Sequence, residues 1–262
     1  MKSEYNERSI ECSTGIVRVL EKGEGSKLGY FAGLHGLPKW QPILNELSKN
    51  RKIVTPSLPG CPGGSNYEHL DGVLDWGLAV RDIHIAAGLD GADLIGTSIG
   101  ATLAADIAAI WPGSVGKLVL IAPYGHFDED LPTVDVFAQY PDQLPNVLSA
   151  NGENYSKYIS APDDVDEVEW DLSLLRAQMA AAQMLWPLGD TGILKRLNRI
   201  TQPTLVVWGS DDRIIPASYA DKFADAITGQ TRIKIVEGAG HKVEFDAPEE
   251  VAGAIYEFFD ET

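Results

Sequence analysis

Short apolar runs alternate with longer segments of helical periodicity, and this alternation constrains the fold more than any other feature. The runs rich in β-branched or other apolar residues lie at 15–21, 27–34, 52–57, 92–96, 117–122, 204–209 and 232–237. Between them, segments such as 74–89 and 251–259 carry apolar residues at helical spacing. Strand and helix in repeated succession predict the α/β class, with a mainly parallel sheet flanked by helices.

The region 124–199 interrupts this alternation. It has no convincing strand, but it contains prolines and helical segments such as 168–186. We therefore predict a core in two parts, 1–123 and 200–262, separated by a helical insertion. Residues 124–190 are rich in aspartate and glutamate, and their only lysine or arginine side chains are Lys157 and Arg176. The local electrostatic field is therefore negative and discourages anionic ligands.

Charge and hydropathy exclude several classes of partner. The 262 residues carry a formal net charge of -17, which repels phosphate backbones and anionic lipid. No apolar stretch reaches the length of a membrane span, and the polar start MKSEYNERS lacks the core of a secretion signal. We expect a cytoplasmic protein without nucleic-acid or membrane partners. Cys12 and Cys61 are the only cysteines, which argues against a disulfide scaffold.

The stretch GTSIG (96–100) carries the strongest chemical signal. It follows the apolar run 92–96 and precedes a helical segment in which Ile99, Leu103, Ile107 and Ile110 recur at helical spacing. Glycines two residues before and after the serine remove side chains that would clash with neighbouring backbone in a sharp strand-to-helix turn. Such a turn raises Ser98 above the strand ends as a candidate nucleophile, with the Ile99 amide at a helix N-terminus.

A serine nucleophile needs a histidine as base and usually a carboxylate to orient it. His241 lies in a glycine-rich loop directly after the predicted strand 232–237, whereas His84 falls within a predicted helix. Asp211 and Asp212 both follow the predicted strand 204–209. Since parallel strands end at one edge of a sheet, these groups could meet there.

In the segment after strand 204–209 the sequence resembles the α/β-hydrolase superfamily, in which the acid stands three residues after a glycine and four before a proline. Gly209, Asp212 and Pro216 match that spacing, so the resemblance favours Asp212, with Asp211 as the alternative. The order serine, aspartate, histidine also agrees. The loop LHGLP (34–38) is similar to HGxP loops of the superfamily, which implies that the Leu37 amide joins that of Ile99 in an oxyanion hole.

The resemblance also implies that the insertion 124–199 is a cap over the active site. Substrate-pocket candidates come from the loops beside the three catalytic candidates and from this cap. These candidates are His35, Thr97, His126, Phe137, Arg176, Met179 and Trp186.

Together these features predict a serine hydrolase that cleaves a small, neutral carboxylic ester, thioester or lactone through an acyl-enzyme. We expect no metal and no organic cofactor, because HExxH, paired CxxC and GxGxxG motifs are absent from the sequence. The expected partner is a small ester-like substrate, and a homodimer is left open.

Two other functions compete with ester hydrolysis. Carbon–carbon bond hydrolases of aromatic ring-cleavage pathways also use serine and a cap, often with a cap arginine, a part that Arg176 could play. They commonly have asparagine before the serine and tryptophan after the histidine, where this chain has Thr97 and Lys242. The third candidate is a non-catalytic receptor for a small hydrophobic molecule on the same fold.

Overall fold

The computed structural model describes residues 5–187 and 189–260, whose strands form one mainly parallel sheet in the order β1-β2-β4-β3-β5-β6-β7-β8. β2 runs antiparallel to β1 and β4, and the other neighbours are parallel. The strands are β1 (Asn6–Cys12), β2 (Gly15–Lys22), β3 (Lys27–Phe31), β4 (Lys52–Pro56), β5 (Asp93–Thr97), β6 (Leu118–Ile121), β7 (Thr204–Gly209) and β8 (Thr231–Val236). The predicted α/β class is confirmed.

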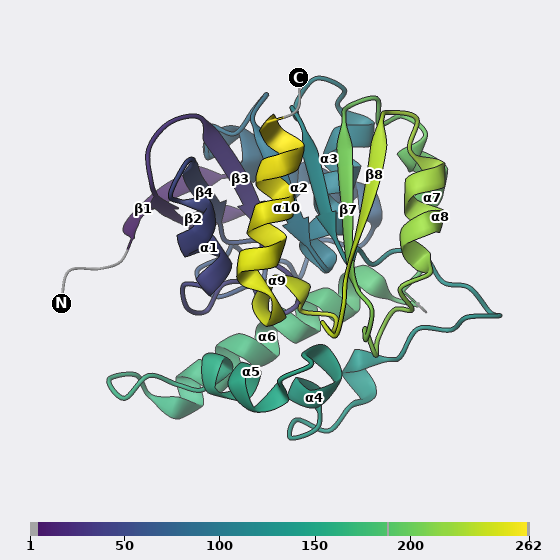
Figure 1. The fold of residues 1–262 in the computed structure, drawn as a ribbon. Helices are drawn as coiled ribbons and strands as arrows, with labels where there is room; N and C mark the ends of the chain where they lie inside the picture. Colours follow the sequence, from purple (N-terminus) through teal and green to yellow (C-terminus); the bar gives the residue numbers. More distant parts are fainter. Residues whose placement is uncertain (1–4, 188, 261–262) are drawn as a thin grey trace.

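Helices cover both faces of this sheet (Figure 1). α1 (Pro42–Leu47), α9 (Val243–Asp246) and α10 (Pro248–Asp260) pack together on one face. α2 (Val73–Ala86), α3 (Ile99–Ile110), α7 (Leu194–Leu197) and α8 (Tyr219–Ala226) form a continuous series of contacts on the other. Strands β5 and β6 are buried along nearly their whole length, as expected for the centre of a sheet with helices on both faces.

A helical segment connects β6 to β7 and lies across the carboxyl ends of the strands (Figure 1). It contains the short 3₁₀ turn η1 (Val136–Ala138) and the helices α4 (Leu144–Leu148), α5 (Gly152–Ile159) and α6 (Glu167–Leu185). Asp166 precedes α6 as its N-cap, and its side chain accepts a hydrogen bond from the Glu169 amide. The limits of a cap at residues 124 and 199 remain a prediction.

Strand β1 was not predicted from the sequence. It lies at the edge of the sheet, and only Ile10 among its side chains is buried. An edge strand with one face to solvent and few apolar residues lacks the hydrophobic signal by which the other strands are found. The polar N-terminal segment therefore gives no sequence signal for β1, which extends the sheet by pairing with β2.

The turn between β5 and α3 is tightly packed against the backbone of α3 and of β3. A Cβ on Gly96 would lie 2.5 Å from Ala101 Cα, and one on Gly100 would lie 2.3 Å from the Phe31 carbonyl oxygen. Both contacts are shorter than real Cβ atoms make. This confirms the expectation that these two glycines permit the turn.

Replacing Gly100 by alanine is predicted to lower the free energy of unfolding by about 2 kcal/mol or more, because the new methyl group must displace the β3 backbone. Denaturant unfolding measures the change. Gly253 in α10 is the matched control: it is exposed, and a Cβ there meets nothing within 4 Å. Gly253→Ala should stabilise by about 0.5–1 kcal/mol. Equal effects of the two variants would contradict this account.

Candidate active site

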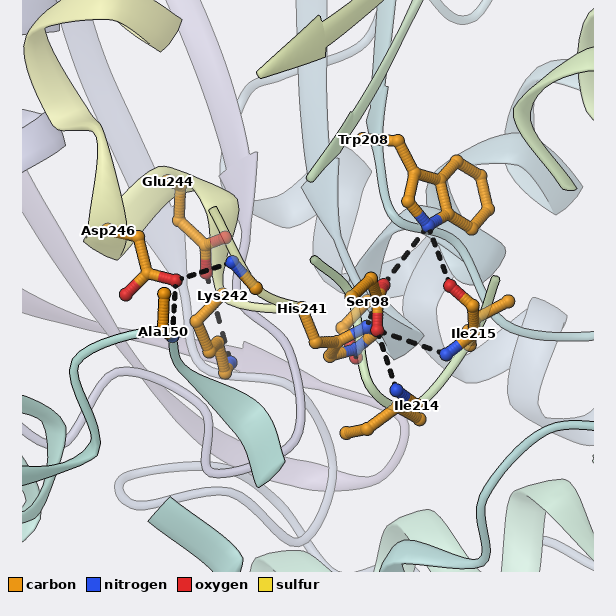
Figure 2. A network of polar contacts seen from close by, with 11 residues as sticks. Ser98, Ala150, Trp208, Ile214, Ile215, His241, Lys242, Glu244 and Asp246 are labelled. Carbon is orange, nitrogen blue, oxygen red and sulfur yellow. Dashed lines mark hydrogen bonds and ion pairs between the residues drawn. The ribbon is translucent and has the colours of Figure 1, made fainter. Parts of the chain in front are cut away.

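Ser98 stands at the turn from β5 into α3 with φ 54° and ψ -122°. A positive φ is strained for a residue with a Cβ, and such strain persists only where surrounding packing enforces it. The side chain is 1% exposed, and its Oγ lies 2.9 Å from His241 Nε2 (Figure 2). The serine hydroxyl is thus within hydrogen-bond distance of a base and shielded from water.

His241 lies between β8 and α9, and its Nδ1 is 2.9 Å from Asp212 Oδ2. Both side chains are fully buried. Because a carboxylate accepts hydrogen bonds, Nδ1 carries the proton and Nε2 is free to accept one from Ser98. The structure therefore brings Ser98, His241 and Asp212 into one hydrogen-bonded chain, although they are distant in sequence.

The Asp212 carboxylate is held by three further donors (Figure 2). Its Oδ1 accepts from the Ile214 and Ile215 amides at 2.8 and 3.0 Å, and its Oδ2 accepts from Trp208 Nε1 at 3.0 Å. Trp208 was missed from the sequence, because it reads as one more apolar residue of β7. Asp211, the alternative acid, is exposed and accepts from Ser210 instead.

The two predicted oxyanion donors lie in buried backbone. Ile99 opens α3, where the first amides have no intrahelical acceptor. The loop carrying Leu37 is fixed by Arg18, which donates to the Leu37 carbonyl at 2.8 Å and to that of Pro62 at 2.9 Å. Within the described chain, no residue accepts a hydrogen bond from the Leu37 or Ile99 amide. Both amides are therefore available to a ligand oxygen.

His35 connects the same loop to the insertion. Its Nδ1 lies 2.9 Å from the Tyr155 hydroxyl, and its Nε2 lies 2.7 Å from Gln178 Nε2. Burial, together with a smaller contribution from the nearby Lys242 charge, lowers the pKa of His35 to about 3. The ring is neutral, with Nε2 accepting from the glutamine. This agrees with an anchoring function rather than a second base.

Asp246 joins the histidine loop to the insertion (Figure 2). Its carboxylate accepts from the Gly240 and Ala150 amides at 2.8 and 2.9 Å, and from the Ser149 hydroxyl. The Lys242 amide adds a bond to the Leu148 carbonyl at 2.8 Å. The position of His241 thus depends on the chain that links α4 to α5, a dependence that the sequence did not reveal.

A buried ion pair follows His241 directly. Lys242 and Glu244 are each 1% exposed, and Nζ lies 3.8 Å from the glutamate Oε1 (Figure 2). Neither Glu244 oxygen has a hydrogen-bond partner in the described chain. Burial lowers the pKa of Lys242 and raises that of Glu244. The residue after the histidine is therefore an interior amine, not a solvated lysine.

Two cavities flank the second half of α6. The small cavity has a volume of about 20 Å³ and includes Gly33, Ile99 and Met184 in its wall. The large cavity has a volume of about 290 Å³ and is lined mainly by apolar side chains, among them Phe137 and Trp186. Of the predicted pocket residues, Phe137 and Trp186 line the large cavity.

The other pocket candidates line neither of these cavities. Arg176 is directed to the surface, where it pairs with Glu68 at 3.1 Å, and Met179 is 56% exposed. His126 packs against the Tyr219 ring. Thr97 is buried at the end of β5, directly before Ser98, and His35 binds the insertion as described above. α6 turns Arg176 and Met179 away from these two cavities, and their assignment to a substrate pocket stays a prediction.

The described residues contain no group of three or more histidine, cysteine, aspartate or glutamate side chains suited to hold a metal ion. Their helices include none that is both long and apolar enough to cross a bilayer. Cys12 and Cys61 are free, and burial raises the pKa of the Cys61 thiol to about 12.

The fold and the arrangement at the strand ends define an α/β hydrolase. A family model described as "Alpha/beta hydrolase family" matches residues 33–254, and the chain belongs to this family. Among curated relatives, monoacylglycerol lipase ABHD6 of Homo sapiens is 26% identical over 256 residues, covering 86% of this chain and 73% of the lipase. The 2-hydroxy-6-oxo-2,4-heptadienoate hydrolase of Pseudomonas putida is 25% identical, covering 83% of this chain and 82% of that enzyme.

Solved structures agree on the fold. The 2-hydroxy-6-oxo-6-phenylhexa-2,4-dienoate hydrolase of a Rhodococcus species superposes with a TM-score of 0.80 at 17% identity, covering 98% of this chain and 99% of that one. Carboxylesterase CesB of Bacillus subtilis gives a TM-score of 0.66 at 19% identity, covering 99% and 93%. At these identities the likeness establishes the architecture alone.

The burial of His35 predicts a pH dependence of stability. Its folded pKa of about 3 is below the unfolded value near 6.5, so the unfolded chain binds the proton first. The resulting stability is fully present above about pH 6.5 and is lost as pH falls toward 3, at up to about 1.4 kcal/mol per pH unit. His35→Gln should flatten the decline in urea unfolding free energy between pH 7 and 5.

The control for this measurement is His69→Gln, because His69 is exposed in a loop. Its decline with pH should match that of the unmodified protein. A His35→Gln variant with the same decline would show that His35 is not the group responsible.

Proposed function

We propose that this protein is a serine hydrolase that cleaves small, neutral carboxylic esters, including thioesters or lactones, through an acyl-enzyme. The observation that carries the proposal is the buried chain Ser98–His241–Asp212, with 2.9 Å between each pair of partners. A serine linked in this way to a neutral imidazole can be deprotonated as it attacks.

In the first half of the reaction, Ser98 Oγ bonds to the ester carbonyl carbon while its proton passes to His241 Nε2. The carbonyl oxygen becomes an oxyanion, which the Leu37 and Ile99 amides would stabilise. Loss of one such donor typically costs about 3 kcal/mol of transition-state stabilisation. When the C–O bond breaks, the electron pair leaves with the alcohol oxygen, which takes the proton from Nε2.

In the second half, His241 Nε2 accepts a proton from water, whose oxygen bonds to the acyl carbon. The tetrahedral intermediate collapses, the carboxylic acid leaves, and Ser98 Oγ regains the proton from Nε2. Asp212, fixed by Trp208 and two amides, stabilises the imidazolium formed in both halves. The chain's own residues balance every proton, so this route requires no metal or organic cofactor.

Carbon–carbon bond hydrolysis of vinylogous diketones is the second candidate. The similarity to the 2-hydroxy-6-oxo-2,4-heptadienoate hydrolase favours it. The surface ion pair of Arg176 with Glu68 disfavours it, because the cap arginine that would receive an anionic substrate is directed away from both cavities. A receptor without turnover is disfavoured by the complete hydrogen-bonded chain at Ser98.

A fluorophosphonate probe should label Ser98 in one-to-one stoichiometry, because it reacts with a serine activated by a neighbouring base. Ser98→Ala should abolish labelling, and His241→Ala should reduce activated-ester hydrolysis by about 10³-fold or more. Intact-mass and peptide mass spectrometry locate the label. Asp211→Asn is the matched control for Asp212→Asn, and only the latter should lose activity. Labelling at another residue would refute the assignment.

Ester and carbon–carbon cleavage can be separated by comparing kcat/KM for short-chain esters with kcat/KM for a vinylogous 1,5-diketone. We expect the esters to be turned over faster, because Arg176, the cap arginine that would receive the diketone's carboxylate, is directed to the surface. Spectrophotometric assays follow both reactions. Faster turnover of the diketone would reverse the ranking, and saturable binding without turnover of either would favour the receptor.

A further inference from the structure

The second half of α6 separates two cavities of very different size. Ala177, Ala180, Ala181 and Met184 recur at helical spacing and face the small cavity of about 20 Å³. Ala182, Leu185 and Trp186 also recur at helical spacing, and they face the large cavity of about 290 Å³. The first volume is little more than one water molecule needs, whereas the second approaches the size of a ligand pocket.

The small cavity adjoins the nucleophile and the candidate oxyanion hole. Its wall includes Ile99, which follows Ser98, and Gly33, which leads into the Leu37 loop. The position of a Cβ on Gly33 would lie only 2.6 Å from Ser98 Cβ. After the proposed attack, the acyl group stays covalently attached to Ser98 with its oxygen at the Leu37 and Ile99 amides. The acyl chain therefore has to enter this confined space.

Tyr124 connects the large cavity to the histidine. Tyr124 forms part of its wall, and the Tyr124 ring packs edge-on against the His241 imidazole with 5.3 Å between ring centroids. The departing alcohol oxygen must receive its proton from His241 Nε2, so the leaving group lies on the imidazole side of the ester. The geometry of proton transfer thus directs the alcohol toward the large cavity.

We propose that the large cavity binds the alcohol part of the substrate, and that the small cavity admits only a short acyl group. The substrates are then short-acyl esters, of the acetyl type, of bulky apolar alcohols. This inference rests on the proposed ester hydrolysis.

The lining of the large cavity indicates a neutral and largely apolar alcohol. Phe127, Val134, Val136, Leu185 and Trp186 supply apolar surface. Asp135 is the acidic residue in its wall and opposes a second carboxylate there. The hydroxyl of Tyr124 is buried without a hydrogen-bond partner in the described chain, so an acceptor on a bound ligand would satisfy it.

Two isomeric esters test the assignment, because they differ only in the side of the carbonyl that carries the phenyl ring. Phenethyl acetate places the ring in the alcohol, and ethyl phenylacetate places it in the acyl group. Both release primary alcohols, so their intrinsic reactivity is similar. We expect kcat/KM for phenethyl acetate to be higher by about 30-fold, the effect of burying one aromatic ring on one side only.

Matched variants on the two faces of α6 should shift this ratio in a predictable way. Met184→Ala enlarges the small cavity and should raise kcat/KM for ethyl phenylacetate about tenfold or more. Ala182→Leu fills the large cavity and should lower kcat/KM for phenethyl acetate by a similar factor. Fluorophosphonate labelling of Ser98 in both variants verifies that each remains folded at the active site.

The outcomes distinguish this inference from the proposed function. A ratio near one, a preference for ethyl phenylacetate, or a ratio unchanged by Met184→Ala and Ala182→Leu would overturn the assignment of the cavities. Labelling of Ser98 without turnover of either ester would overturn it too. Absence of both labelling and ester turnover would instead refute the serine-hydrolase proposal itself.

Discussion

The alignment of Ser98 and His241 depends on the buried carboxylate of Asp212. It accepts hydrogen bonds from two backbone amides, from an indole and from an imidazole, so both oxygens are occupied. This arrangement decides which nitrogen of His241 carries the proton, and hence whether Ser98 faces an acceptor. The sheet supports it by ending β5, β7 and β8 at one edge, where the three segments meet.

Burial strengthens the electrostatic interactions within this hydrogen-bonded chain. Charges interact more strongly where water is excluded, so the imidazolium of the proposed reaction would gain more from Asp212 than it would at a surface. The same exclusion makes the buried Lys242–Glu244 pair costly, since neither carboxylate oxygen finds a donor in the described chain. The hydrogen-bonded chain of Ser98, His241 and Asp212 therefore lies beside buried polar groups that lack hydrogen-bond partners.

The sequence predicted the central strands, the strand-to-helix turn and the grouping of a serine, an aspartate and a histidine. Each depends on local patterns around Gly96, Asp212 and His241. The sequence did not separate the residues of the insertion that line a cavity, such as Phe137 and Trp186, from those that do not, such as Arg176 and Met179. α6 carries apolar side chains on opposite faces, with Met179 exposed and Met184 buried, so periodicity alone cannot select the inner face. Trp208 was missed because it reads as one more apolar residue of β7, although its partner Asp212 lies only four residues away. Asp246 was missed because its partners Ser149 and Ala150 lie in a distant segment that only the tertiary structure brings near.

The bonds of Asp246 also limit how a substrate can enter. Outward displacement of α4 and α5 would break the links from residues 148–150 to the loop that carries His241, and would release the imidazole from its aligned position. An opening between the segment around η1 and the end of α6 leaves those links intact. Under the proposed function, admission of substrate at that end would be compatible with an assembled proton path, and the hydrogen-bonded groups would not have to be realigned in every turnover.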